Sequence, residues 1–186
     1  MFLGIFVGGR AQRMGGVPKG LLRAPDSDES LIERLARIGR EAGLEPVLVG
    51  TADLGPALNT LPRLLDREPR VGPLSGLSAL LEHAAGARAI AVACDMPRVS
   101  TALVSRLAHE SLEAEVLAPR DRVTGKWQPL CARYDADRVR PQLAQAIVRG
   151  VRSFQAVFGE LSVVQLSLSE AEHTELVDWD CPQDMT

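Results

Sequence analysis

A short apolar run that breaks into a glycine-rich, basic loop constrains this chain more than any other feature. Residues 2–7 (Phe-Leu-Gly-Ile-Phe-Val) have the length and composition of a buried strand, and residues 8–19 hold four glycines, two arginines and a lysine. Glycine lets the backbone approach an anion, and arginine and lysine neutralise negative charge. We therefore predict a phosphate-binding loop after a first strand. Its spacing matches neither GxxxxGK(S/T) nor GxGxxG.

Apolar segments of strand length recur along the chain, with helix-like patterns between several of them. The expected strands cover residues 2–7, 45–50, 88–93, 115–118, 128–133 and 162–168. The expected helices cover residue 31 to a stop at Gly43, 74 to about 85, 101 to 110, 136–148 and 151–158.

Two of these strands indicate the kind of sheet. Residues 2–7 and 88–93 are apolar nearly throughout, which is typical of parallel strands that are covered on both faces. Strands that alternate with helices build an α/β fold. We therefore expect a three-layer α/β/α sandwich with a mostly parallel, Rossmann-like sheet. Ligands of such sheets bind beyond the carboxyl ends of the strands, where the glycine-rich loop begins.

Size, charge and cysteine usage exclude several classes of protein. A chain of 186 residues, 46% of them hydrophobic, predicts a single domain over residues 1–186 with a sizeable core. The formal net charge of −3 is unlike the basic field of a nucleic-acid-binding protein. Three widely spaced cysteines fit neither a zinc site nor a disulfide scaffold, which favours a reducing cytoplasm. The opening apolar stretch is too short to span a bilayer.

Residues 8–19 resemble the signature loop of the MobA-type nucleotidyltransferases, in which Gly-Gly precedes Arg-Met-Gly and then a lysine. The resemblance covers nearly the whole chain. It implies an enzyme of nucleotidyltransferase fold that transfers GMP from GTP to molybdopterin and releases pyrophosphate. Cytidylyl and sugar-phosphate nucleotidyltransferases carry variants of this loop, and Pro18 before Lys19 is familiar in those relatives.

Within the loop, backbone amides around the glycines are expected to line the triphosphate. The resemblance assigns the positive charge to Arg13 and Lys19, which we take as catalytic residues because charge stabilisation carries much of a nucleotidyl transfer. Arg10 can equally face solvent. The expected nucleotide-binding residues of the loop are Gly8, Gly9, Arg10, Arg13, Met14, Gly15, Gly16 and Lys19.

Asp95 is the third expected catalytic residue, beside Arg13 and Lys19, and the expected ligand of a divalent cation. It follows the apolar strand 88–93 within Cys94-Asp95-Met96-Pro97, and a hard cation such as Mg²⁺ prefers a carboxylate oxygen. The stretch resembles the family's Cys-Asp-x-Pro element, whose Asp holds Mg²⁺, although Asp95 could instead cap the turn before Pro97. Cys94 is expected to be a buried small residue rather than a nucleophile.

The end of the chain resembles the family's closing element with altered residues. Asp178 and Asp180 stand where that element has asparagines, and Cys181 replaces threonine. Related nucleotidyltransferases use a carboxylate at this place. Asp180 is therefore expected to join Asp95 around the cation.

Asp66 and Gly76 are the expected contacts of the nucleoside. Residues 64–66 and 72–77 resemble a family segment in which an acidic residue helps to bind the nucleoside and a Gly-Pro turn opens a helix beside it. The pair Gly72-Pro73 is also ordinary at a helix start, and Asp66 could be an exposed loop acid.

The acceptor is expected to meet the second half of the chain. The resemblance points to Lys126 and Gln128 before a strand, and to Arg152 in a Gly-x-Arg-Ser turn. Arg152 could as well be a salt-bridged surface residue. Residues 1–100 would form the NTP-binding half and residues 101–186 the acceptor-binding half.

These features together predict a cytoplasmic, Mg²⁺-dependent nucleotidyltransferase that acts on GTP and molybdopterin as a monomer or weak homo-oligomer, without nucleic-acid or membrane partners. Two alternatives stay open. One is a cytidylyl- or sugar-phosphate nucleotidyltransferase of the same fold, favoured by Pro18 and Asp180. The other is a non-catalytic nucleotide-binding adaptor in molybdoenzyme maturation, which the altered closing residues allow.

Overall fold

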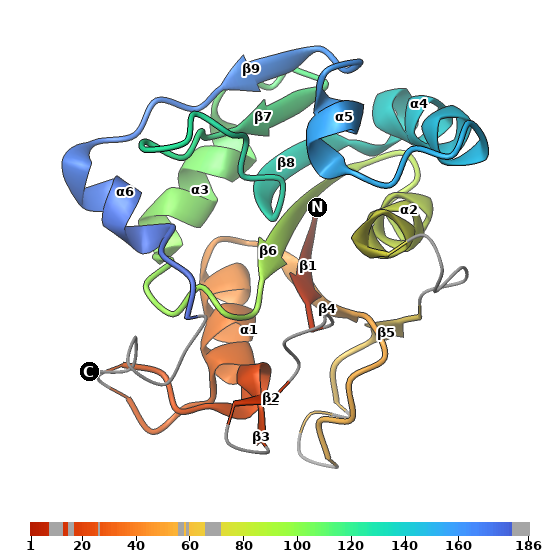
Figure 1. The fold of residues 1–186 in the computed structure, drawn as a ribbon. Helices are drawn as coiled ribbons and strands as arrows, with labels where there is room; N and C mark the ends of the chain where they lie inside the picture. The colour runs from red at the N-terminus through yellow and green to blue at the C-terminus, as the bar shows by residue number, and fades with distance from the viewer. Residues whose placement is uncertain are drawn as a thin grey trace.

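A seven-stranded sheet organises the chain (Figure 1). The structure, a computed structural model, describes residues 1–7, 13–14, 17–25, 27–55, 58, 60–65 and 72–179. The strand order across the sheet is β5-β4-β1-β6-β8-β7-β9. Its strands are β1 (Phe2–Phe6), β4 (Glu45–Val49), β5 (Arg63–Leu64), β6 (Arg88–Ala93), β7 (Val116–Ala118), β8 (Cys131–Asp135) and β9 (Val163–Gln165).

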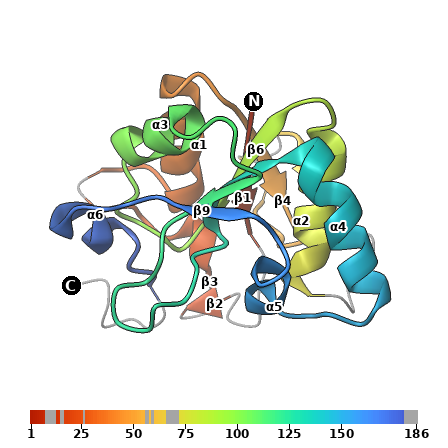
Figure 2. The same cartoon turned by 90° about the horizontal axis from the view of Figure 1, so that it is seen from above.

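Helices cover both faces of this sheet, so the predicted three-layer sandwich is confirmed. In Figures 1 and 2, α1, α3 and α6 lie on one face, and α2, α4 and α5 lie on the other. Successive side chains of a strand point to opposite faces. Leu3 and Ile5 of β1 therefore share a core with α1 and α3, whereas Phe6 shares one with α2 and α4. The helices are α1 (Leu31–Glu41), α2 (Pro73–His83), α3 (Thr101–His109), α4 (Ala136–Val148), α5 (Phe154–Phe158) and α6 (Glu170–Glu175).

The sheet is mostly parallel, as expected. β1 pairs in parallel with β4 and with β6, whereas β8 runs antiparallel to both β6 and β7. Phe6 ends β1 and Ala93 ends β6, and the two residues are partners in the register. The segments that follow β1 and β6 therefore leave the same edge of the sheet side by side.

Local signals in the sequence fix where the helices begin. Ser30 forms a capping box with Glu33 at the start of α1, and the Ser100 side chain accepts a hydrogen bond from Leu103 N–H at the start of α3. Pro73 occupies the first turn of α2 directly after Gly72, whose φ of 71° is open to glycine at little cost. The interpretation of Gly72-Pro73 as a helix start is thus confirmed.

Some elements differ from the expectation. The strand expected at 128–133 lies at 131–135, because the chain turns at 129–130 around a proline that has no N–H for pairing. The helix expected at 151–158 begins only at Phe154. Further short elements are too brief for a periodic signal: β2 (Arg13–Met14), β3 (Val17–Pro18), the 3₁₀ turn η1 (Lys19–Leu21), β5 and α6.

The longest described helix, α4, has 13 residues. A membrane-spanning helix needs roughly 20 apolar residues. Within the described ranges, none of the helices has the length and apolar character needed to cross a bilayer.

Candidate active site

The side chains of Lys19 and Asp95 meet at the edge where β1 and β6 end. Lys19 Nζ donates a hydrogen bond to Asp95 Oδ2 across 3.1 Å, and the two groups form an ion pair. The side chain of Lys19 is 7% exposed and that of Asp95 is 23% exposed. A lysine so deeply buried requires a charged partner. The structure thus brings two of the three expected catalytic residues into contact.

Close packing of the turn η1 holds Lys19 near Asp95. A Cβ atom on Gly20 would come within 2.4 Å of Ile32 Cδ1 in α1, and it would lie 3.6 Å from Cys94 Cβ. Glycine lets the turn pack this closely against Ile32 of α1, while its distance to Cys94 is an ordinary van der Waals contact. Leu22 N–H then donates to Lys19 O and closes the turn.

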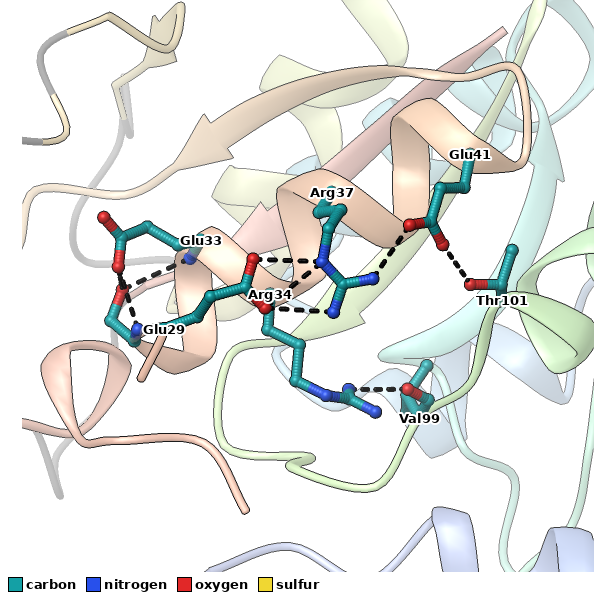
Figure 3. A network of polar contacts seen from close by, with 8 residues as sticks. Glu29, Glu33, Arg34, Arg37, Glu41, Val99 and Thr101 are labelled. Carbon is teal, nitrogen blue, oxygen red and sulfur yellow. Dashed lines mark hydrogen bonds and ion pairs between the residues drawn. The ribbon is translucent and has the colours of Figure 1, made fainter. Parts of the chain in front are cut away.

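Hydrogen bonds fix the backbone around Asp95 from two sides. Cys94 N–H donates to Phe6 O across 3.1 Å, which ties this segment to the end of β1. Arg34 of α1 donates from Nη1 to Val99 O across 2.7 Å, as Figure 3 shows. Partial burial, with the nearby charge of Arg37, lowers the pKa of Arg34 from its ordinary value.

Trp179, near the end of the chain, also contacts this segment. The backbone N–H of Trp179 donates a hydrogen bond to Asp95 O across 2.9 Å, and the residue is 7% exposed. Sequence reasoning assigned no role to Trp179. The available signal was a bulky aromatic residue between two acids in the closing element.

The Cys94 thiol next to Asp95 is chemically inert. Burial, reinforced by the charge of Asp95, raises its pKa to about 12. The thiolate is the nucleophilic form of cysteine, so Cys94 stays protonated and unreactive at neutral pH. This agrees with its expected role as a buried small residue.

The chemistry of Asp95 fits a divalent cation. Its carboxylate is a hard oxygen donor that is partly open to solvent at the edge of the sheet. Among the residues that the structure describes, no three His, Cys, Asp or Glu side chains gather into a ready-made metal cage. A cation held by Asp95 would therefore complete its shell with substrate oxygens and water. Asp180, the second expected ligand, lies outside the described residues.

Most of the other nucleotide-binding predictions also fall outside the described residues, namely Gly8, Gly9, Arg10, Gly15, Gly16 and Asp66. Arg13 and Met14 form β2, which pairs antiparallel with β3 so that Arg13 lies opposite Pro18. Because β3 leads directly into η1, Arg13 and Lys19 belong to one compact hairpin and turn. Gly76 is buried in the first turn of α2.

The segment between β7 and β8 is a hairpin at the same edge of the sheet (Figure 2). Asp121 N–H donates to Lys126 O, and Gln128 N–H donates to Pro119 O. The guanidinium of Arg120 lies 3.7 Å from the ring centre of Trp127, a cation–π contact. We call residues 119–128 the β7–β8 hairpin. It carries two of the predicted acceptor residues, an exposed Lys126 and a half-buried Gln128.

Gln155 of α5 joins that helix to the β7–β8 hairpin. Its side chain accepts a hydrogen bond from Trp127 N–H across 3.1 Å and donates one to Trp127 O across 2.8 Å. Arg152, the third predicted acceptor residue, is exposed and donates to the carbonyl oxygens of Ile147 and Val151 beside the end of α4; its contact with the acceptor stays a prediction. Sequence reasoning missed Gln155, because its contact joins distant segments, and it also missed Arg120, whose contact lies within the hairpin.

A groove of about 990 Å³ lies elsewhere, between β5, α2 and α4. None of its lining residues belongs to η1, to the Asp95 segment or to the β7–β8 hairpin, so it is separate from the candidate site. The lining residues are Arg63, Leu64, Leu65, Ala79, Glu82, His83, Arg140, Pro141 and Ala144.

A mostly parallel sheet covered on both faces, with a lysine–carboxylate pair beyond its carboxyl edge, defines an α/β protein with its candidate site where such sheets bind ligands. The chain belongs to the MobA-like NTP transferase family, whose model matches residues 4–165. It is accordingly a nucleotidyltransferase.

Relatives with curated names match nearly the whole chain. It is 31% identical to a probable molybdenum cofactor guanylyltransferase of Opitutus terrae, over 97% of this chain and 90% of that protein. It is 30% identical to a molybdenum cofactor guanylyltransferase of Xanthomonas euvesicatoria, over 96% and 89%. A molybdenum cofactor guanylyltransferase of Pseudomonas putida is 32% identical, over 96% and 92%.

Solved structures share the fold. Molybdopterin-guanine dinucleotide biosynthesis protein A from Archaeoglobus fulgidus superposes with a TM-score of 0.76 at 22% identity, covering 100% of this chain and 95% of that one. The 2-C-methyl-D-erythritol 4-phosphate cytidylyltransferase from Thermus thermophilus gives a TM-score of 0.67 at 16% identity, with coverage of 100% and 95%. At these identities the likeness establishes the fold.

Proposed function

We propose that this protein transfers GMP from GTP to molybdopterin, which forms the guanine dinucleotide of the cofactor and releases pyrophosphate. The observation that carries the proposal is the buried contact between Lys19 and Asp95 at the carboxyl edge of the sheet. The names of relatives that match nearly the whole chain support it. We place the protein in the cytoplasm, because Cys94 and Cys131 are free thiols that suit a reducing compartment.

In the proposed reaction, a phosphate oxygen of molybdopterin attacks the α-phosphorus of GTP in line. The bond from that phosphorus to the oxygen that bridges to the β-phosphate breaks, and pyrophosphate leaves with the electron pair. Such a transfer depends mainly on positioning and on charge neutralisation. We assign the neutralisation to Arg13, Lys19 and the amides of the glycine-rich loop, and we assign binding of the nucleoside to Asp66 and Gly76.

We propose Mg²⁺ as the cation, held by Asp95 and Asp180. When bound, it supplies positive charge to the phosphate oxygens of the substrate. The partly exposed carboxylate of Asp95 supports this assignment. Lys19 neutralises that carboxylate in the present arrangement, and we assign its ammonium group to a phosphate oxygen of the substrate when nucleotide is bound.

For the acceptor we propose the surface of the β7–β8 hairpin, with Lys126 and Gln128 as contacts. The hairpin leaves the same edge of the sheet as the segments after β1 and β6, and Gln155 braces it against α5. Arg120 adds a second cationic side chain there. Residues 1–100 then bind the nucleotide and residues 101–186 bind the acceptor.

Pyrophosphate release by the purified protein tests this proposal. We expect release that requires GTP, molybdopterin and Mg²⁺ together, and that Asp95→Asn lowers by about a hundredfold or more, as loss of an electrostatic catalytic group does. Asp137→Asn is the matched control, because this exposed acid only accepts a hydrogen bond from Gly86 N–H. Release with CTP but not GTP would favour a cytidylyltransferase. GTP binding without turnover would favour the adaptor.

A further inference from the structure

Trp179 contacts the chain on both sides of the Lys19–Asp95 pair. Through its backbone N–H it donates to Asp95 O across 2.9 Å. Through its ring it packs into a small apolar cluster with Ala24 and Leu31, against which Leu22 also packs. The residue is 7% exposed, so both contacts are shielded from water.

The ring of Trp179 packs on the segment that continues directly from Lys19. Leu22 N–H donates to Lys19 O, and Leu31 N–H donates to Leu22 O across 2.9 Å. Leu22 therefore links the turn that holds Lys19 to the N-terminus of α1. The indole ring of Trp179 packs against this linkage, and the backbone N–H of Trp179 donates a hydrogen bond to Asp95 O.

The cluster around Trp179 is separate from the two large cores that lie under the helices. Ala24, at 3% exposure, is a small residue directly before Pro25 and the acidic residues Asp26, Asp28 and Glu29 of the sequence. Packing of the Trp179 ring in this cluster explains why the ring is buried. Such packing alone would not require the hydrogen bond from Trp179 N–H to Asp95 O. The two contacts together link the loop after β6 to the turn after β3.

We propose that Trp179 is a positioning residue that sets the distance between Lys19 and Asp95, so that the closing segment of the chain holds the catalytic site together. This inference rests on the proposed function and deepens it. In the sequence, Trp179 stands between Asp178 and Asp180.

Steady-state kinetics of Trp179→Ala and Trp179→Phe test the proposal. We expect kcat to fall about tenfold or more in Trp179→Ala, because displacement of catalytic groups by about 1 Å is enough for such a loss. Trp179→Phe keeps an aromatic ring and the backbone N–H, and should restore kcat to within about threefold of the original. KM for GTP should change less than kcat.

Val104→Ala is the matched control, because Val104 is fully buried in α3 within the large core that α1 and α3 form on the sheet. Its melting temperature should fall, while kcat well below that temperature stays within about twofold. Equal kcat values for Trp179→Ala and Val104→Ala would overturn the proposal, since Trp179 would then be an ordinary core residue. Should Trp179→Ala fail to fold, Trp179→Leu takes its place, with the same expectations.

Hydrogen exchange without nucleotide keeps this test independent of the proposed function. We expect Trp179→Ala to speed exchange of the Leu22 and Cys94 amides about tenfold or more, and Val104→Ala to leave them unchanged. Faster exchange in a protein without any transferase activity would refute the proposed function but would support the positioning role of Trp179. Unchanged exchange at both amides would overturn the positioning role of Trp179 even in an active enzyme.

Discussion

Lys19 Nζ lies 3.1 Å from Asp95 Oδ2 although the two residues are 76 positions apart in the chain. Each charge neutralises the other in a place where water reaches Asp95 only in part and Lys19 hardly at all. A cation that binds Asp95 must compete with the ammonium group of Lys19. A phosphate that draws Lys19 away would free the carboxylate, so nucleotide and cation should bind in concert.

Replacement of Lys19 by methionine tests this competition. Without the ammonium group, we expect the nucleotide-free protein to bind Mn²⁺ several times more tightly, while transferase activity falls about a hundredfold. Calorimetric titration with Mn²⁺ measures the first effect and pyrophosphate release the second. Lys126→Met, on the exposed hairpin, serves as control and should leave Mn²⁺ affinity unchanged. Equal Mn²⁺ affinities of Lys19→Met and the original protein would refute the competition.

The two buried thiols should be unreactive in the folded protein. Burial raises the pKa of Cys94 and that of Cys131 to about 12, so neither forms a thiolate at pH 8. In a Cys181→Ser variant, we expect an aromatic disulfide reagent to release colour only after denaturation, and then for two thiols. The contribution of the two protonated thiols to the free energy of unfolding is fully present below their ordinary pKa of 9.0 and is lost as the pH rises toward 12. Rapid labelling of native protein would contradict the burial.

Glu172 should make folding stability depend on pH in the acid range. Hydrogen bonds from the Ser169 backbone and from Arg106 lower its pKa from 4.5 to about 2. Because the carboxylate is the favoured form in the folded state, its contribution is complete above pH 4.5 and is lost as the pH falls toward 2. We expect Glu172→Gln to cost about 1 kcal/mol at neutral pH, because glutamine can keep the capping-box geometry but loses the charge that strengthens the bonds from Ser169 N–H and Arg106.

Urea unfolding at pH 7 and at pH 3 measures this effect. The difference between Glu172→Gln and the original protein should shrink at pH 3. Glu170→Gln, on the same helix, is the control; its exposed ion pair with Arg122 is worth less than about 0.5 kcal/mol. A difference that is equal at both pH values would show that the carboxylate charge plays no part.

Arg133 should be among the most stabilising residues of the chain. It is fully buried and donates to three carbonyl oxygens at the end of α3, those of Leu107, Glu110 and Ser111. Replacement by methionine removes all three bonds, although Ser111 O keeps the one from Ala114 N–H, and we expect the loss to cost about 3 kcal/mol. Arg149→Ala removes only an exposed ion pair with Glu160 and should cost about 0.5 kcal/mol or less. Denaturant midpoints compare the two, and equal losses would refute the capping role.

Gln155 should affect the acceptor and not the nucleotide. Gln155→Ala removes both hydrogen bonds to the Trp127 backbone and loosens the β7–β8 hairpin. We expect KM for molybdopterin to rise about fivefold or more, in line with the loss of about 1 kcal/mol of positioning. KM for GTP should stay the same, as it should for Gln145→Ala on the exposed side of α4. A rise confined to GTP would place the acceptor elsewhere.

The sequence predicted the fold well where a signal is periodic or local. Apolar runs located β1, β4 and β6, and serine caps located the starts of α1 and α3. Pro129 delayed β8 by three residues, because the missing N–H acts only once a partner strand is in place. The two-residue strands β2, β3 and β5 carry too few side chains for a period to show.

The candidate site divides in the same way. Lys19 and Asp95 were predicted one at a time, each from a motif that follows a buried strand. Their contact depends on parallel pairing of β1 with β6 and on the missing side chain of Gly20. Neither condition can be read from one segment alone.

By itself, then, the sequence determined which groups are available and which strands deliver them, because strand burial, caps and glycine-rich turns are properties of short segments. Only the tertiary structure decided that Trp179 holds Asp95, that Arg133 caps α3 and that Gln155 holds the β7–β8 hairpin. Each of these is a hydrogen bond between distant segments. Such a bond depends on where the whole sheet places two backbones, and this is a property of packing that no local pattern records.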